Sequence, residues 1–166
     1  VDLRVWVDAS HPVIRVEGES ARDLEATADL EVWRTERREL KGTDDWLEMR
    51  SAFGLQDRED GTRQSPNPDY HVYVEPDMIV PDLTDRILWY HRNERSAFNV
   101  TLELQAQGDL IGRVRDPLLH RTFGGLIDGE GFVSVSPTRL TTAEPTRSID
   151  LSIYPHTSQP ESIDVW

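Results

Sequence analysis

The sequence predicts a mainly β fold, an antiparallel β-sandwich with one or two short helices. Two observations predict this class. Apolar and polar residues alternate in short runs, which is the pattern of strands with one buried face. About eight to ten such runs are separated by turn residues at intervals of roughly 8–12 residues, as in antiparallel sandwiches. A parallel α/β sheet would instead need regular helices between its strands, and the pattern does not show them.

Composition narrows the classes of function. The chain has 166 residues, enough for one domain with its own core. Its 31 acidic residues outnumber 18 Lys and Arg, so nucleic acid and anionic membranes are poor partners, because both bind clustered cations. No stretch approaches the roughly 20 apolar residues of a membrane span. Without cysteine, and with five histidines that lack metal-ligand spacing, the sequence predicts no metal and no cofactor.

Strands dominate the first part of the chain. Residues 1–7 alternate cleanly, 8–12 supply turn residues, and 13–17 form a second strand, so we expect an antiparallel hairpin. The longest alternation, over 24–34, predicts a strand with one wet face. Trp33 lies on that wet face, where it either covers a neighbouring element or offers a flat platform to a ligand.

The middle of the chain mixes element types. Residues 44–53 favour a short helix, and the polar stretch 54–69 reads as a long exposed loop. Residues 70–80 resume the strand pattern with a break at Pro76, and 86–93 form the next strand. Residues 96–106 suit a helix or a strand, and we expect the helix.

The last part returns to strands after a second short helix, which we expect over 110–120 with an interruption at Pro117. A tight turn at 128–131 predicts that 132–135 is the return strand of 123–127. Further strands follow: a short one that begins near Leu140, and one over 148–154. The residues 158–161 resemble the start of a helix.

A row of polar and aromatic side chains ends the strand at 86–93. Sugars are bound by aromatic rings that stack on them and by bidentate polar groups that hold their hydroxyls. The row matches that chemistry, and its candidate ligand-binding residues are Trp89, His91, Arg92, Asn93 and Glu94, joined by Trp33 and by Arg121 from a second dense stretch. The alternative is a buried polar network that satisfies backbone groups.

Glu94 is also a candidate for catalysis. A glycosidase needs two carboxyl groups roughly 5–10 Å apart. Nothing in the sequence selects the second one from 31 acidic residues, so no catalytic pair is assigned.

Several segments together resemble a known family. They are Leu3-Arg4-Val5-Trp6-Val7-Asp8-Ala9, His11-Pro12-Val13, Leu30-Glu31-Val32-Trp33-Arg34, Trp89-Tyr90-His91-Arg92-Asn93-Glu94, and the stretch from Asp116 to Gly124. This set is similar to a bacterial domain of unknown function. That domain forms the N-terminal part of secreted proteins similar to glycoside hydrolases of family 95, the α-L-fucosidase-like group.

The resemblance implies a β-super-sandwich packed on a helical (α/α) barrel that carries the catalytic carboxylates. None of the barrel's catalytic motifs can be carried onto this sequence. It implies a single sandwich domain over 1–160 whose first strands precede Val1, and a linker helix that begins at 161–166. It also implies a secreted or periplasmic location.

Three functions follow as expectations. The first is a non-catalytic sandwich module of a carbohydrate-active protein, with a carbohydrate and a C-terminal helical barrel in cis as partners. The second is an independent carbohydrate-binding module that uses Trp33, Trp89 and Tyr90. The third is a small glycosidase with Glu94 as one carboxylate.

Overall fold

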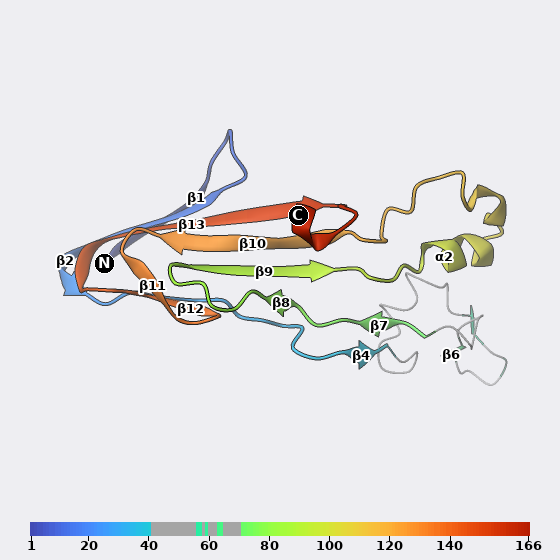
Figure 1. The fold of residues 1–166 in the computed structure, drawn as a ribbon, viewed down its shortest axis with the longest axis horizontal. Helices are drawn as coiled ribbons and strands as arrows, with labels where there is room; N and C mark the ends of the chain where they lie inside the picture. Colours follow the sequence, from blue (N-terminus) through green and yellow to red (C-terminus); the bar gives the residue numbers. More distant parts are fainter. Residues whose placement is uncertain (41–55, 58, 60–62, 65–70) are drawn as a thin grey trace. The chain divides into compact units, whose positions relative to one another are not determined.

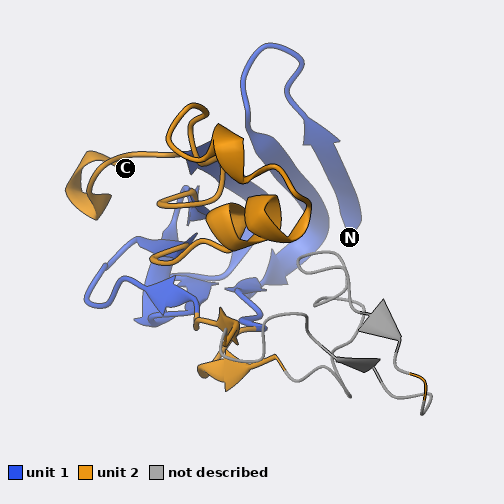
Figure 2. Cartoon of the chain, turned by 90° about the vertical axis from the view of Figure 1, so that its right-hand side faces the viewer, with its two compact units in different colours: residues 1–33, 77–92, 122–158 blue, residues 34–76, 93–121, 159–166 orange. Residues whose placement is uncertain are grey.

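The computed structural model describes residues 1–40, 56–57, 59, 63–64 and 71–166. The chain forms two compact units, which are coloured separately in Figure 2. Unit 1 comprises residues 1–33, 77–92 and 122–158, and unit 2 comprises 34–76, 93–121 and 159–166. Each unit is described by itself below.

Unit 1 contains a six-stranded sheet in which every neighbouring pair is antiparallel (Figure 1). In spatial order its strands are β1 (Asp2–Val7), β2 (Ile14–Leu24), β13 (Thr146–Ser158), β10 (Thr122–Gly129), β9 (Arg86–Arg92) and β8 (Met78–Ile79). A three-stranded sheet in the same unit has the order β11 (Phe132–Ser136), β12 (Arg139–Thr142) and β3 (Thr27–Asp29).

The core of unit 1 lies between these two sheets. Ile87, Ile127 and Leu151 come from neighbouring strands of the large sheet, and Phe132 and Leu140 come from the small one. Apolar side chains from both sheets pack together in one cluster, so the unit is a β-sandwich. The predicted mainly β, antiparallel fold is therefore confirmed.

Unit 2 has short elements. Two antiparallel pairs of two-residue strands are β4 (Arg38–Glu39) with β7 (Tyr73–Val74), and β5 (Gln56–Asp57) with β6 (Arg63–Gln64). The helix α2 spans Phe98–Leu104, and single 3₁₀ turns occupy η1 (Gly108–Leu110) and η2 (Ile163–Val165). The helix expected over 96–106 is confirmed, and the Ser96 hydroxyl accepts a hydrogen bond of 3.0 Å from the Phe98 N–H at its start.

The strand expected over 24–34 is wrong in its extent. Beyond Leu24, which ends β2, only the three residues of β3 pair there, and their partner β12 is itself four residues long. The predicted faces nevertheless hold. Leu24, Ala26, Ala28, Leu30 and Val32 are half-buried, and the residues between them are exposed.

The expected hairpin of 123–127 with 132–135 is also wrong. β10 already has β9 on one side and β13 on the other, so neither edge is left for a return strand. The chain instead passes through Gly131, whose φ is +77°, and enters the small sheet as β11. A turn signal in the sequence does not say which sheet the next strand joins.

The second helix expected over 110–120 is replaced by the single turn η1. Gly112 follows with a φ of +77°, outside the helical region, and Pro117 removes a donor further on. The loop expected over 54–69 contains the β5–β6 pair, and the rest of that stretch lies outside the described residues. The helix expected over 44–53 lies outside them as well.

Candidate functional site

Trp89, the first of the candidate sugar-binding residues on β9, packs inward. Its side chain is half-buried and lies against the core cluster of unit 1. In the β9–β10 register it stands opposite Gly125. A Cβ atom at Gly125 would lie 2.8 Å from Cη2 of the indole, so the missing side chain makes room for the ring. Trp89 therefore serves as a packing residue.

His91 forms a buried pair with Asp77. Its Nδ1 atom lies 3.0 Å from Oδ1 of Asp77, and both side chains are about nine-tenths buried. The ring of Phe123 lies beside the imidazole, with 5.1 Å between ring centroids. Since Asp77 immediately precedes β8 and His91 lies on β9, the pair connects two adjoining segments of the sheet edge.

Arg92 is also directed at a neighbouring strand. Its Nη1 atom donates a hydrogen bond of 3.0 Å to Oγ1 of Thr122, which is its cross-strand partner on β10. Thr122 is fully buried. Trp89, His91 and Arg92 thus all make contacts inside unit 1.

The remaining members of the predicted row belong to unit 2. The Asn93 N–H donates to the carbonyl oxygen of Arg121, and the Asn93 carbonyl accepts from the His120 N–H, at 3.0 and 2.8 Å. The Asn93 side-chain amide donates to the Leu118 carbonyl at 3.2 Å, and Nε of Arg121 donates to the Pro117 carbonyl at 3.2 Å. These contacts shape the 117–121 segment. Glu94 is exposed.

Asp116 organises the same segment. Its Oδ1 atom accepts hydrogen bonds from the Leu118 and Leu119 N–H groups at 2.8 and 3.0 Å. Burial alone raises the pKa of Asp116. The Leu119 N–H, the Ser96 hydroxyl, the Leu118 N–H and the charge of His120 outweigh burial, so the pKa lies below its usual value.

A small cavity of about 210 Å³ lies against this turn within unit 2. It is lined by Arg115, Asp116, Leu119, His120, Gln159, Pro160 and Glu161. The Gln159 side-chain amide holds one wall, since its Nε2 donates to the carbonyls of Asp116 and Leu119 at 2.6 Å each.

Trp33 is strongly exposed. Its relative exposure is 84%, and it lies beyond β3 at the end of the first segment of unit 1. The predicted set is therefore divided: Trp33, Trp89, His91 and Arg92 in unit 1, and Asn93, Glu94 and Arg121 in unit 2.

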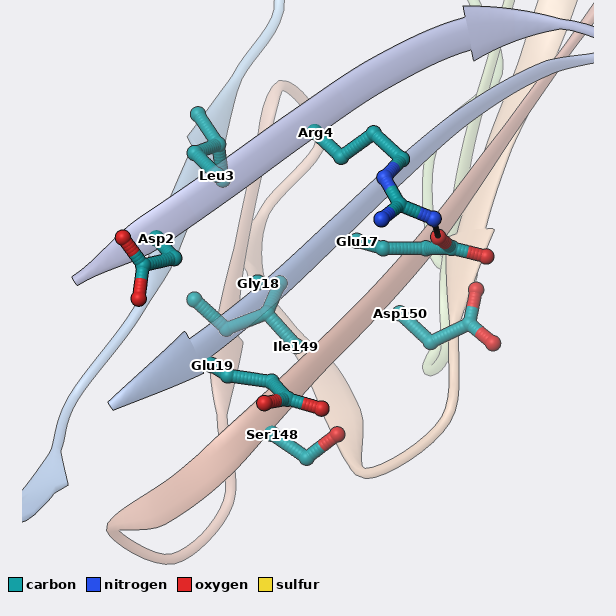
Figure 3. Close-up of a pocket in the computed structure, with 9 residues that line it drawn as sticks. All are labelled: Asp2, Leu3, Arg4, Glu17, Gly18, Glu19, Ser148, Ile149 and Asp150. Carbon is teal, nitrogen blue, oxygen red and sulfur yellow. Dashed lines mark ion pairs between the residues drawn. The ribbon is translucent and has the colours of Figure 1, made fainter. Parts of the chain in front are cut away.

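A groove of about 490 Å³ that is not among the predicted sites lies over β1, β2 and β13 (Figure 3). Two polar rows run across these strands: Asp2, Glu19 and Ser148 form one, and Arg4, Glu17 and Asp150 form the other. The row between them, Leu3, Gly18 and Ile149, sends its side chains to the opposite face. Figure 3 shows the carboxylates of Glu17, Glu19 and Asp150 pointing to the same side.

The groove is strongly acidic. Four carboxylates line it with a single guanidinium, that of Arg4, which lies 3.9 Å from Glu17 in an exposed ion pair. Such walls attract cations and accept hydrogen bonds from hydroxyl and amino groups, and they repel anions. In the described part of the chain, no group of three or more His, Cys, Asp or Glu has a geometry that could hold a metal ion.

The sequence contains part of the information that predicts this groove, but it does not show which strands are neighbours. Each of its three strands alternates and has charged residues on its non-core face, which a sequence can show. Their adjacency depends on the pairing of β2 with β13, whose partners are more distant along the chain than any local pattern reaches. None of the described helices is long and apolar enough to cross a membrane.

Fold and groove define the class: an antiparallel β-sandwich with an acidic surface groove. The family model described as "Domain of unknown function (DUF5703)" matches residues 1–166, so the chain belongs to that family. Comparison with curated proteins gave no match, and neither did comparison with solved structures.

Proposed function

We propose that this chain is a non-catalytic β-sandwich module of a bacterial, glycoside-hydrolase-like, carbohydrate-active protein. In this proposal the module packs on a C-terminal helical barrel of the same secreted or periplasmic protein, and the barrel performs the chemistry on a carbohydrate. The link to carbohydrate comes from the family resemblance of the sequence. The packing role has a structural argument of its own.

The observation that carries the packing role is an exposed apolar row on β1. Leu3, Val5 and Val7 are 62, 61 and 67% exposed, although Val16, the β2 partner of Val5, packs against the core cluster. β1 is also the edge strand of the six-stranded sheet. Contiguous apolar side chains at a sheet edge mark a surface that another element covers.

The non-catalytic role is supported by the contacts of the polar row. Trp89, His91 and Arg92 are used inside unit 1, in packing, in the pair with Asp77 and in the bond to Thr122. Such fixed side chains stabilise a fold. A binding residue would have to release these contacts before it could receive a substrate.

Two proteins test this proposal: the 166-residue chain, and a longer chain that also contains the proposed helical barrel. We expect glycan hydrolysis from the longer chain alone. We also expect Val5→Lys to lower the thermal unfolding midpoint of the longer chain more than that of the 166-residue chain. Hydrolysis by the short chain, or an equal effect of Val5→Lys in both, contradicts the proposal.

The second candidate, an independent carbohydrate-binding module, is favoured by the exposed indole of Trp33. Retention of the 166-residue chain in gels that contain neutral polysaccharide tests it, with Trp33→Ala as the variant. The third possibility, a glycosidase that uses Glu94, is tested by the same hydrolysis assay on the short chain with Glu94→Gln.

A further inference from the structure

Two partly exposed aromatic rings lie on the outer face of the six-stranded sheet, away from the small sheet. Trp6 of β1 is 38% exposed and Tyr154 of β13 is 37% exposed. The registers place Trp6, Arg15 and Ser152 in one cross-strand row, and Tyr154 two residues further along β13 on the same face. In the described part of the chain, neither ring takes part in a hydrogen bond or ring contact.

Arg15 lies on β2, the strand between those that carry the two rings. Nη1 of Arg15 donates a hydrogen bond of 2.5 Å to Oγ of Ser152, which is almost fully buried. In the described part of the chain this is the one hydrogen bond that the guanidinium makes, and a guanidinium carries five N–H donors. Because strands are spaced about 4.8 Å apart, Trp6 and the β13 position of Ser152 are separated by about 10 Å.

The polar row continues across the sheet beside an apolar one. Asp128 of β10 stands opposite Ser152, and Arg86 of β9 stands opposite Asp128. The next row consists of Tyr154, Leu126 and Leu88. A strip of alternating charge and hydrogen-bonding groups therefore runs parallel to an aromatic and aliphatic strip on the same face.

A sugar ring matches this arrangement. A pyranose presents an apolar C–H face, which stacks on aromatic rings, and an edge of hydroxyls, which bind guanidinium and carboxylate groups. The charges on this face favour one class of sugar. The acidic groove lies on the same face, beside the row of Trp6, Arg15 and Ser152, and its carboxylates repel anionic sugars. A neutral glycan meets no such repulsion.

We propose that Trp6, Arg15 and Tyr154 form a platform for a neutral, pyranose-containing oligosaccharide, with Trp6 and Tyr154 stacking on the sugar rings and Arg15 holding hydroxyls. The inference rests on the carbohydrate part of the proposed function. It adds a binding surface that shares no residue with the predicted row at 89–94.

The test measures binding of the 166-residue chain to neutral gluco-, galacto- and xylo-configured oligosaccharides and to a polyuronate, by calorimetry and tryptophan fluorescence. We expect binding to at least one neutral series and none to polyuronate. Trp6→Ala and Tyr154→Ala each weaken this binding about tenfold, and Trp6→Phe and Tyr154→Phe, which keep a ring, retain most of it. The control Val135→Ala, at a 57% exposed position on β11 of the small sheet, leaves it unchanged.

Three outcomes overturn the platform. They are no binding to any neutral series, preference for polyuronate, or binding that Trp33→Ala removes and the Trp6 and Tyr154 variants do not. Circular dichroism of each variant confirms that the fold is kept. The hydrolysis comparison between short and long chains is a separate measurement, so failure of the platform is distinguishable from failure of the proposed function.

Discussion

Trp89 of β9 lies across Gly125 of β10, and a Cβ atom at Gly125 would stand 2.8 Å from Cη2 of the indole. The neighbouring Gly124 is restricted too, since a Cβ there would lie 2.1 Å from the Trp89 carbonyl oxygen. Gly125 is therefore required by the tryptophan ring, because a side chain there would occupy the space of the indole. Gly124 is required by the close approach of the β9 backbone.

Gly125→Ala is expected to lower the free energy of unfolding by about 1–3 kcal/mol, because the added methyl group forces the indole or the backbone to move. Urea unfolding measures the change. The matched control is Gly108→Ala, where the nearest atom to the new Cβ is 3.9 Å away, and it should have a much smaller effect. Equal effects of the two variants would show that the indole is not held against Gly125.

His91→Ala is expected to cost about 2 kcal/mol of stability, because Asp77 loses a hydrogen-bond partner in a place that water barely reaches. The exposed pair of His11 with Asp8, at 3.3 Å, provides the control, and His11→Ala should change little. A double-mutant cycle with Asp77→Asn isolates the pair's coupling free energy. A coupling near zero would refute the structural role of this contact.

Asp116 predicts an acid-sensitive component of stability. Its folded pKa is lower than its unfolded value of about 3.9, so its contribution is complete above that value and is lost as pH falls through the folded pKa. Asp116→Asn should therefore be less stable than the parent chain near neutral pH. The difference in urea midpoint between Asp116→Asn and the parent chain should disappear below about pH 4. A difference that grows on acidification would contradict the lowered pKa of Asp116.

Trp33 should contribute more than Trp89 to quenching of tryptophan fluorescence by acrylamide, because the residue is 84% exposed. Trp33→Phe is expected to remove more of the quenchable emission than Trp89→Phe, whose indole is half-buried against the core. A Stern–Volmer comparison of the two variants measures this difference. A larger loss in Trp89→Phe would mean that the two rings have been assigned the wrong environments.

Local patterns predicted which faces of the strands are buried, and they did so even where pairing failed. Leu24 to Val32 alternates between half-buried and exposed positions although only β3 forms a ladder within it. Alternating apolar and polar residues show which side chains of an extended segment face the core. Pairing depends on the partner, and the length of β12 could not be seen from the residues of β3.

The candidate site was harder to predict for the same reason. Residue type alone suggested binding chemistry for His91 and Arg92, but their partners Asp77 and Thr122 come from other segments. The Arg15–Ser152 bond joins residues 137 positions apart. No local pattern in the sequence encodes such a neighbour, so the outer face of the sheet became visible only with the strand order.

β13 has a further consequence for how the chain folds. It pairs with β2 on one side and with β10 on the other, so it alone joins the N-terminal hairpin to the rest of the large sheet. During synthesis, β1 and β2 emerge long before the strand that completes their sheet. Two-stranded hairpins are only marginally stable in water, so the large sheet cannot be completed before residues 146–158 have been synthesised. Until then, the edge of β2 that β13 later covers is open to pairing with other chains.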